Sequence, residues 1–534
     1  MKTNRTLILR IALGGALILL AAFSALPLIP PRAVSADAPA ARFSAGRAMG
    51  DLQVVARESH GSGSAAQARV RDYIASQVAA LGLSAEIQAS GQVENILVRL
   101  PGSNPTLTVL VTGHYDSNGA TPGAGDDGLS TVAMLESIRV LHASSPLRND
   151  ILFLFTDGEE LGWLGARAFI REYPGARQDM GVVLCFDGLP GNAPLVLRQT
   201  SPGDAWLVRE MTGLPLRLWT GSWQNPAERT DTDTDFESFQ AAGFTGVEIE
   251  NEKAGIRYHT DLDTVGAISP DLVQSFGESM LTLANHFGSI DLRAKTNGPD
   301  MTFFSLPLAG LMAHPSWVTP GLSGLGIAAL LAFVVVAWRG RQFSPKRFLL
   351  SVLGLVAGIL LITLVAQLAW GVVTQSHRAE VAAYGGFDTK AGWLSGFMIG
   401  ATVLMIGLLT GLSRRLGGVT VAAAGAAVYL IFALALYVLI QGDNPITTAY
   451  ITWPFVGSVA ALGVLLFTKN PVWKVVLLLL SALLMLILVV PYLVLGTYTP
   501  EDAWVPIVIT CVMLSLFAPQ VDGIFGRALT NAPD

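Results

Sequence analysis

Residues 151–160 read ILFLFTDGEE, a short apolar run that ends in two adjacent carboxylates. A run of this length, bounded by polar residues, predicts a strand that is buried on both faces of a sheet. Helical segments at 130–142 and 161–171 flank this run. Three more runs of the same kind lie at 107–112, 182–186 and 245–250. Strands that alternate with helices predict an α/β domain with a mixed, largely parallel central sheet flanked by helices.

Polar residues follow each of these apolar runs at its carboxyl end. In chain order they are His114 and Asp116, then Glu159 and Glu160, then Asp187, and finally Tyr258 and His259. The carboxyl ends of parallel strands lie at one edge of a sheet, which is where open α/β sheets bind ligands. We therefore expect these side chains to meet at one site.

Imidazoles mixed with carboxylates are the ligands that a divalent ion such as zinc accepts. The adjacent pair Glu159 and Glu160 is harder to explain by structure alone, because neighbouring buried carboxylates raise each other's pKa unless a metal neutralises one. We predict that Glu160 binds metal and that Glu159 acts as a general base. Each motif alone has an ordinary explanation as a turn, a helix cap or a solvated pair. Their ordered arrangement after apolar strands favours a metal site.

The ordered motifs resemble family 28 of the metallopeptidases, which includes aminopeptidases and glutamate carboxypeptidases, with the glutaminyl cyclases as relatives. The resemblance covers about residues 45–290, and the multispan tail makes the whole chain similar to the endoplasmic-reticulum metallopeptidase branch. The motifs are Gly113-His114-Tyr115-Asp116-Ser117, Gly125-Asp126-Asp127-Gly128, Asp157-Gly158-Glu159-Glu160, Phe186-Asp187 and Tyr258-His259-Thr260-Asp261-Leu262-Asp263-Thr264.

The resemblance implies two zinc ions per chain and a role for each motif. Asp126 would bridge the ions; His114 and Asp187 would complete one site, and Glu160 and His259 the other. Glu159 would be the general base, and the carboxylate of Asp116 would orient the His114 ring. Tyr258 is a further candidate for substrate or oxyanion contact. The resemblance also implies that the peptide bond between Asp126 and Asp127 is cis.

The composition divides the chain into a soluble part and a membrane part. Of its 534 residues 51% are apolar, and the mean hydropathy is +0.50. Charged residues are common from about 40 to 292 and become rare from about 303 onward. We predict an N-terminal segment (1–39), a zinc peptidase domain (40–292) and an all-α polytopic membrane domain (293–534). The net charge of −6 gives no reason to expect nucleic acid as a partner.

About seven membrane spans are expected in the C-terminal part. They lie near 318–338, 348–373, 393–412, 418–440, 447–467, 474–495 and 503–519. Basic residues cluster in alternate loops: Arg339, Arg341, Lys346, Arg347, Arg414, Arg415, Lys469 and Lys474. The loops at 375–390, 441–444 and 496–502 are poor in them. The positive-inside rule then places the basic loops in the cytoplasm and the peptidase domain outside it. A bacterial plasma membrane is the first choice, and an organelle membrane with the domain in its lumen is the topologically equivalent alternative.

The N-terminus carries Lys2, Arg5 and Arg10 before an apolar stretch from 11 to 29. Its length favours an uncleaved anchor, although Val34-Ser35-Ala36 resembles a signal-peptide cleavage site. The two cysteines, Cys185 and Cys511, are expected to be small buried hydrophobes rather than a disulfide pair.

These features favour a membrane-anchored di-zinc peptidase with a peptide or small protein as substrate and membrane lipid around its spans. An aminopeptidase is the first choice. A carboxypeptidase-type enzyme, a glutaminyl cyclase and a non-catalytic receptor or scaffold are the alternatives. A transporter is disfavoured because the expected spans carry no ionisable residue near their centres.

Overall fold

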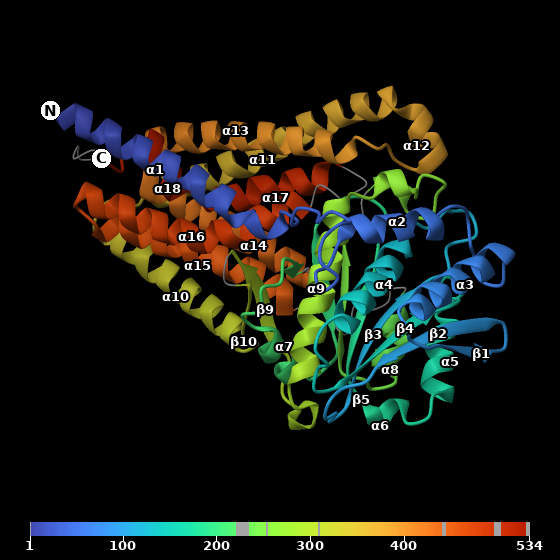
Figure 1. Cartoon of the computed structure of the whole chain (residues 1–534). Coiled ribbons are helices and arrows are strands. Elements are labelled where there is room, and N and C mark those ends of the chain that lie inside the picture. The colour runs from blue at the N-terminus through green and yellow to red at the C-terminus, as the bar shows by residue number, and fades with distance from the viewer. Residues whose placement is uncertain are drawn as a thin grey trace. The chain divides into compact units, whose positions relative to one another are not determined.

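The computed structural model describes residues 2–220, 234–251, 255–307, 310–439, 445–495 and 503–529. The loops expected at 441–444 and 496–502 therefore lie outside the described residues. The chain forms two compact units (Figure 1). The head unit comprises Pro27–Pro315, and the helical unit comprises Met1–Leu26 and Ser316–Asp534.

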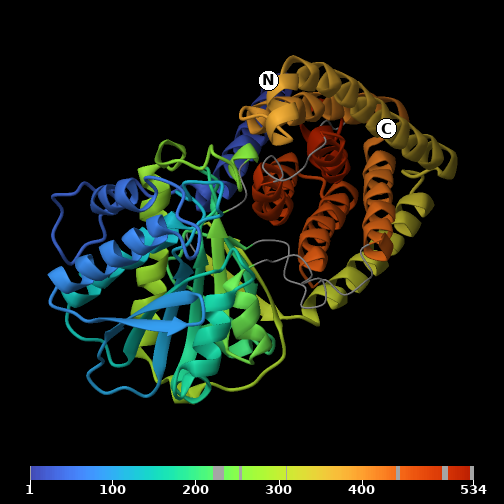
Figure 2. The same ribbon diagram turned by 90° about the vertical axis from the view of Figure 1, so that its right-hand side faces the viewer.

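A mixed sheet of eight strands forms the centre of the head unit, in the order β1-β2-β4-β3-β5-β8-β6-β7. Figure 2 shows this sheet with helices around it. The strands are β1 (Ala85–Ser90), β2 (Val93–Leu100), β3 (Thr108–His114), β4 (Asp150–Thr156), β5 (Met180–Asp187), β6 (Leu195–Thr200), β7 (Trp219–Thr220) and β8 (Gly246–Asn251). The four central strands β4, β3, β5 and β8 run parallel, whereas β1, β2 and β6 pair antiparallel. The predicted mixed, largely parallel sheet is confirmed.

The central strands are apolar on both faces because the sheet has a hydrophobic layer on each side. In β3, Val109 and Val111 belong to the larger apolar cluster, and Leu110 between them belongs to the smaller one on the opposite face. In β4, Phe153 joins the larger cluster and Leu152 the smaller. This alternation explains the unbroken apolar runs in the sequence.

Helices cover both faces of this sheet (Figure 1). The larger apolar cluster includes residues of five helices: α2 (Ala45–Val55), α3 (Ala65–Ala80), α4 (Gly128–His142), α7 (Ala205–Met211) and α9 (Pro270–Ser289). The smaller cluster includes residues of three: α5 (Leu164–Glu172), α6 (Ala176–Asp179) and α8 (Asp235–Ala241). A separate hairpin pairs β9 (Met301–Leu306) with β10 (Gly310–Pro315). The head unit thus extends past the limit at residue 292 that the sequence suggested.

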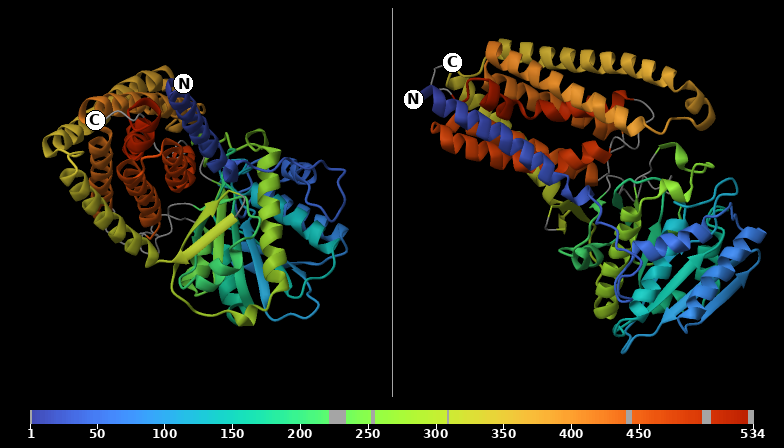
Figure 3. Two further views of the ribbon diagram at one scale, coloured as in Figure 1. Left: turned by 90° about the vertical axis from the view of Figure 1, so that its left-hand side faces the viewer. Right: turned by 45° about the horizontal axis from the view of Figure 1, so that its top comes forward.

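The helical unit is a bundle of long apolar helices (Figure 3). They are α1 (Lys2–Ser24), α10 (Val318–Arg339), α11 (Pro345–Ser376), α13 (Lys390–Leu416), α14 (Gly418–Leu439), α15 (Pro445–Phe467) and α16 (Pro471–Leu495). Three shorter helices complete it: α12 (Arg378–Tyr384), α17 (Trp504–Ser515) and α18 (Ala518–Phe525). The α1 helix packs along α16, with Leu13 fully buried beside Leu478.

Within the described residues, five helices are long and apolar enough to cross a membrane, and the bent pair α17–α18 would make a sixth. The searched parts of α15 and α16 form shorter apolar helices, Thr452–Phe467 and Pro471–Leu486. These apolar helices together support a membrane protein, whereas the number of membrane spans stays a prediction. The segment expected as a span at 503–519 covers α17 and the start of α18, and the two helices meet at an angle of 67°. Pro519 lies at this bend, where it can begin a helix but not continue one. Both cysteines are free and buried, as expected.

Candidate metal centre

The sheet brings the predicted site residues to one edge. His114 is the last residue of β3 and Asp187 the last residue of β5, and these two strands are parallel neighbours. The β4 strand, on the other side of β3, ends at Thr156 just before Glu159 and Glu160. The strand order thus produces the convergence that the sequence pattern predicted.

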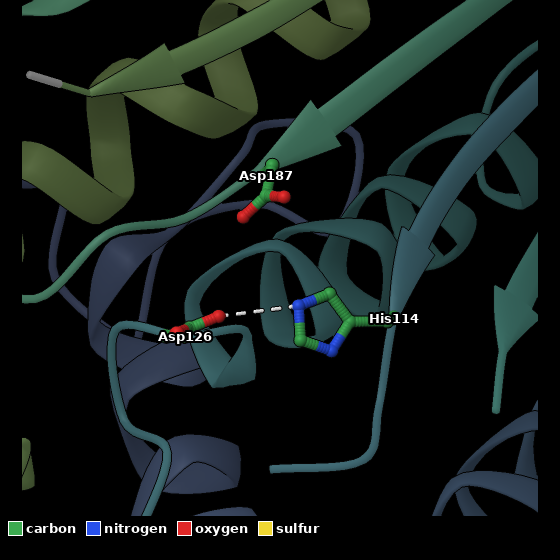
Figure 4. Close-up of side chains that lie close together, drawn as sticks. All are labelled: His114, Asp126 and Asp187. Carbon is green, nitrogen blue, oxygen red and sulfur yellow. Dashed lines mark ion pairs between the residues drawn. The ribbon is translucent and has the colours of Figure 1, made fainter. Parts of the chain in front are cut away.

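The first group of possible ligands comprises His114, Asp126 and Asp187, all of them buried (Figure 4). One ligand atom from each lies within 4.8 Å of the others. The Nε2 atom of His114 lies 3.2 Å from Oδ1 of Asp126. Three donors at these separations can surround one metal ion.

The second group shares Asp126 with the first and adds Glu160 and His259. The Nε2 atom of His259 lies 3.2 Å from Oδ2 of Asp126 and 3.2 Å from Oε2 of Glu160. The two carboxylate oxygens of Asp126 therefore face different imidazoles. His259 has φ +56°, a left-handed conformation that is uncommon for residues other than glycine. This backbone geometry turns its ring toward Asp126.

Glu159 belongs to neither group but lies beside the first. Its Oε2 atom is 3.9 Å from His114 Nε2, and its side chain is buried. Burial raises the pKa of Glu159 well above its usual value, although the nearby His114 opposes this shift. A carboxylate with increased basicity at this position suits proton transfer.

The electrostatics of the cluster favour a bound cation. Burial, followed by repulsion from Asp127, raises the pKa of Asp187 well above its usual value. Burial opposes protonation of His259, but hydrogen bonding to Asp126 and Glu160 raises its pKa to about 9. The site therefore concentrates carboxylates that cannot all ionise without a compensating positive charge.

Unpaired buried oxygens support the same conclusion. The atoms Oδ1 of Asp187, Oε1 of Glu160 and Oε1 of Glu159 have no hydrogen-bond partner among the residues that the structure describes. Buried oxygens without partners are costly unless an ion or a water satisfies them. Together with the two imidazoles, these atoms fit one or two divalent ions of the zinc type.

Asp116 differs in detail from its expected role. The Nδ1 atom of His114 bonds to the main-chain carbonyl of Asp116 at 2.8 Å, whereas the Asp116 carboxylate lies farther away at 3.5 Å. That carboxylate instead accepts a hydrogen bond from the backbone N–H of Glu159 at 3.2 Å. The residue thus contacts both His114 and Glu159.

Tyr258 stacks on His259, with ring centroids 3.8 Å apart. Burial raises the pKa of its phenol above the usual range, so the group stays protonated. The stacking contact supports the ring of His259, and a contact with substrate remains a prediction.

Three residues that were given no role from the sequence also contact the ligands. Asn118 donates to Glu160 Oε2 at 3.2 Å. Asp127, which is joined to Asp126 by a cis peptide bond, accepts from the backbone N–H groups of His114 and Gly188. Asp263 accepts from the backbone of the Asp126 loop. Asp127 and Asp263 both lie inside the quoted motifs, but spacing alone could not separate them from the ligands.

A sheet-edge cluster of imidazoles and carboxylates beside a basic glutamate defines the class of metal-dependent hydrolases. Residues 95–284 match the family described as Peptidase family M28, so the chain carries a domain of this metallopeptidase family. Zinc is the typical metal of this family, and the expected family resemblance is confirmed.

Two of the matching relatives are named as a metallopeptidase and a protease. Endoplasmic reticulum metallopeptidase 1 of Homo sapiens is 29% identical over 264 residues, which are 48% of this chain and 28% of that protein. The vacuolar membrane protease of Candida albicans (strain SC5314 / ATCC MYA-2876) is 29% identical over 234 residues, 41% of this chain and 27% of that protein. The matches thus span under a third of the length of these relatives.

Two solved structures resemble the head unit only distantly. The LapA aminopeptidase of Legionella pneumophila has a TM-score of 0.40 at 15% identity, covering 46% of this chain and 73% of that one. The glutaminyl cyclase of Porphyromonas gingivalis has a TM-score of 0.39 at 18% identity, covering 45% of this chain and 98% of that one.

Proposed function

We propose that this chain is a membrane-anchored di-zinc peptidase that removes N-terminal residues from peptides outside the cytoplasm. One observation carries the proposal: the two groups of possible ligands share Asp126, and Glu159 lies next to them with an unpartnered buried oxygen. His114 and Asp187 would hold one zinc ion, and Glu160 and His259 the other. A pair of ions that share a carboxylate is a recurrent arrangement in hydrolytic enzymes.

Zinc, when bound, supplies Lewis acidity that makes a water molecule a better nucleophile and a carbonyl a better electrophile. Glu159 accepts a proton from the attacking water while the water oxygen forms a bond to the carbonyl carbon of the substrate. Glu159 then donates this proton to the leaving amine as the C–N bond breaks. Asp116 holds the backbone N–H of Glu159 and so keeps the base in place.

The choice of an aminopeptidase rests on the chemistry of the expected ligands. A free α-amine is a nitrogen donor of the kind that zinc accepts, and its capture would fix which bond is cleaved. A carboxypeptidase-type enzyme would instead need a cation for the substrate carboxylate. A glutaminyl cyclase would act on a free N-terminal glutamine and release ammonia rather than an amino acid.

The helical unit supports the proposed orientation. Trp317 is 74% exposed just before α10 begins, and Trp338 is 61% exposed near its other end. The helix between them is about 30 Å long, which matches the apolar thickness of a bilayer. Tryptophans at both ends are typical of the two membrane interfaces. Arg339 and Arg341, which follow Trp338, would place that end of α10 in the cytoplasm by the positive-inside rule, and the head unit outside.

The packing of α1 supports an uncleaved anchor. Leu13 is fully buried against α16 and α18, and the Arg10 guanidinium donates to the Gly526 carbonyl just after α18. A helix held in this way is a structural member of the helical unit, which a removable signal peptide would not be.

The proposal is tested with the purified full chain in detergent. Aminoacyl amides with a free amine and their N-acetylated counterparts are compared, each with and without a zinc chelator. The proposal predicts release of the N-terminal residue from the free amines only, and loss of this activity with the chelator. Equal cleavage of the blocked substrates would overturn the aminopeptidase assignment, and activity in excess chelator would overturn the metal assignment.

A further inference from the structure

We infer that Asp263 is a positioning residue that fixes the bridging carboxylate Asp126 and ties its loop to the loop of His259, an inference that rests on the proposed function. Asp263 is fully buried and belongs to neither group of possible ligands. Its effect is exerted through the backbone.

One residue binds three consecutive backbone N–H groups of the loop that carries Asp126. Oδ1 of Asp263 accepts from Gly125 N at 2.7 Å, and Oδ2 accepts from Asp126 N at 3.1 Å. The main-chain carbonyl of Asp263 accepts from Ala124 N at 3.4 Å. Hydrogen bonds to a buried carboxylate are among the strong ones, so this segment has little freedom to move.

The same residue belongs to the turn that carries His259. Asp263 lies four positions after His259, and its backbone N–H donates to the Thr260 carbonyl at 3.1 Å. The Asp126 loop and the His259 loop are therefore joined by Asp263 before either binds metal. Any shift of one loop changes the 3.2 Å separation between His259 Nε2 and Asp126 Oδ2.

The Asp126 loop also has no room to adapt if Asp263 is lost. A Cβ atom on Gly125 would lie 2.3 Å from Pro190 Cα, so the backbone there is in close contact with the segment after β5. Without its acceptor, the loop cannot shift toward that segment to find another partner. Its N–H groups would be left unsatisfied, and the Asp126 carboxylate would lose its fixed direction.

Replacement Asp263→Asn tests this role with little change in volume. The amide oxygen can accept one N–H, but its NH₂ group faces the other N–H, so one hydrogen bond becomes a contact between two donors. Residues that orient metal ligands in this way affect metal affinity by about 10–100-fold. We expect a loss of Zn²⁺ affinity in this range, measured in the full chain by competition with a chromogenic chelator.

Asp204→Asn is the matched control. Asp204 is also buried and accepts a backbone N–H, that of Met301 at 2.9 Å, but it lies at the start of α7 and contacts no ligand group. We expect the Zn²⁺ affinity of this variant to equal that of the wild type. Wild-type affinity in Asp263→Asn would overturn the inference, whereas absence of Zn²⁺ binding by the wild type would overturn the proposed function instead.

A second measurement needs no variant and covers the case in which Asp263→Asn does not fold. Hydrogen–deuterium exchange of the segment 123–127 is followed in the wild-type chain before and after metal removal. The inference predicts slow exchange of the Gly125 and Asp126 amides in both states, because Asp263 holds them. Fast exchange after metal removal would show that the metal orders this loop, and would overturn the inference.

Discussion

Replacement of Glu159 by Gln separates metal binding from proton transfer. The variant keeps the size of the side chain and its backbone N–H bond to Asp116 at 3.2 Å. It replaces the basic carboxylate, whose Oε2 atom lies 3.9 Å from His114 Nε2, with a neutral amide. Both ligand groups, which do not include Glu159, should stay intact.

The expected loss follows from the role of the residue. Positioned general bases contribute about 10²–10⁴-fold to catalysis, which corresponds to about 2.7–5.5 kcal/mol in the activation free energy. Burial raises the pKa of Glu159, so replacing it with a neutral amide removes a carboxylate whose ionised form is disfavoured there. The metal-free head unit should therefore be no less stable in this variant.

The assay combines three measurements on the full chain: kcat for release of an N-terminal residue, zinc content by mass spectrometry, and the thermal midpoint with chelator present. We expect kcat to fall by at least about a hundredfold, with zinc content and thermal midpoint unchanged. Glu172→Gln on the surface of α5 serves as the control and should retain full activity. If Glu159→Gln kept more than a fifth of the activity, or lost its zinc, the assignment of Glu159 as base would be refuted.

Three further perturbations test the rest of the structure. Phe43→Ala removes a buried ring that packs on Gly277 of α9 and should lower the unfolding free energy by about 3–5 kcal/mol; an unchanged denaturant midpoint would contradict this packing. Burial raises the pKa of Asp204 to about 6, so the folded state favours the protonated carboxyl. The free energy of unfolding should therefore decrease as the pH rises from about 4 through 6. Asp204→Asn should recover at most about 3 kcal/mol at pH 7, and an unfolding curve with unaltered pH dependence would refute that. Both natural cysteines are buried, so a single cysteine introduced at the exposed Gln342 or Thr389 can report on topology. The cysteine at 342 should react with impermeant thiol reagents from the cytoplasmic side, and the one at 389 from the outer side. Reaction of both from one side would overturn the topology.

Much of the fold follows from the sequence because the central strands carry a strong signal. The apolar runs of β3, β4 and β5 are long enough to require burial on both faces, and each ends in polar residues. The outer strands lacked this signal. The β1 strand is only partly buried and includes Glu86 and Gln88, so its pattern does not differ from that of a surface loop.

The clustering of the candidate ligands could be predicted because each is a distinctive residue at a strand end or in a motif. The contacts that support these residues could not be predicted, because the main-chain carbonyl and the side-chain carboxylate of one residue occupy the same position in the sequence. The ring of His114 bonds to the carbonyl of Asp116 rather than to its carboxylate, and only coordinates distinguish the two. Asp263 similarly acts on backbone N–H groups far away in the chain.

We propose that two zinc ions share Asp126 and that both are required for peptide hydrolysis. The most direct test of this proposal is to titrate the metal-free full chain with Zn²⁺ while bound metal and release of an N-terminal residue are measured together. We expect binding to saturate at two ions per chain and activity to be regained over the same titration. Saturation at a single ion with full activity, or full occupancy without hydrolysis of any peptide substrate, would contradict it.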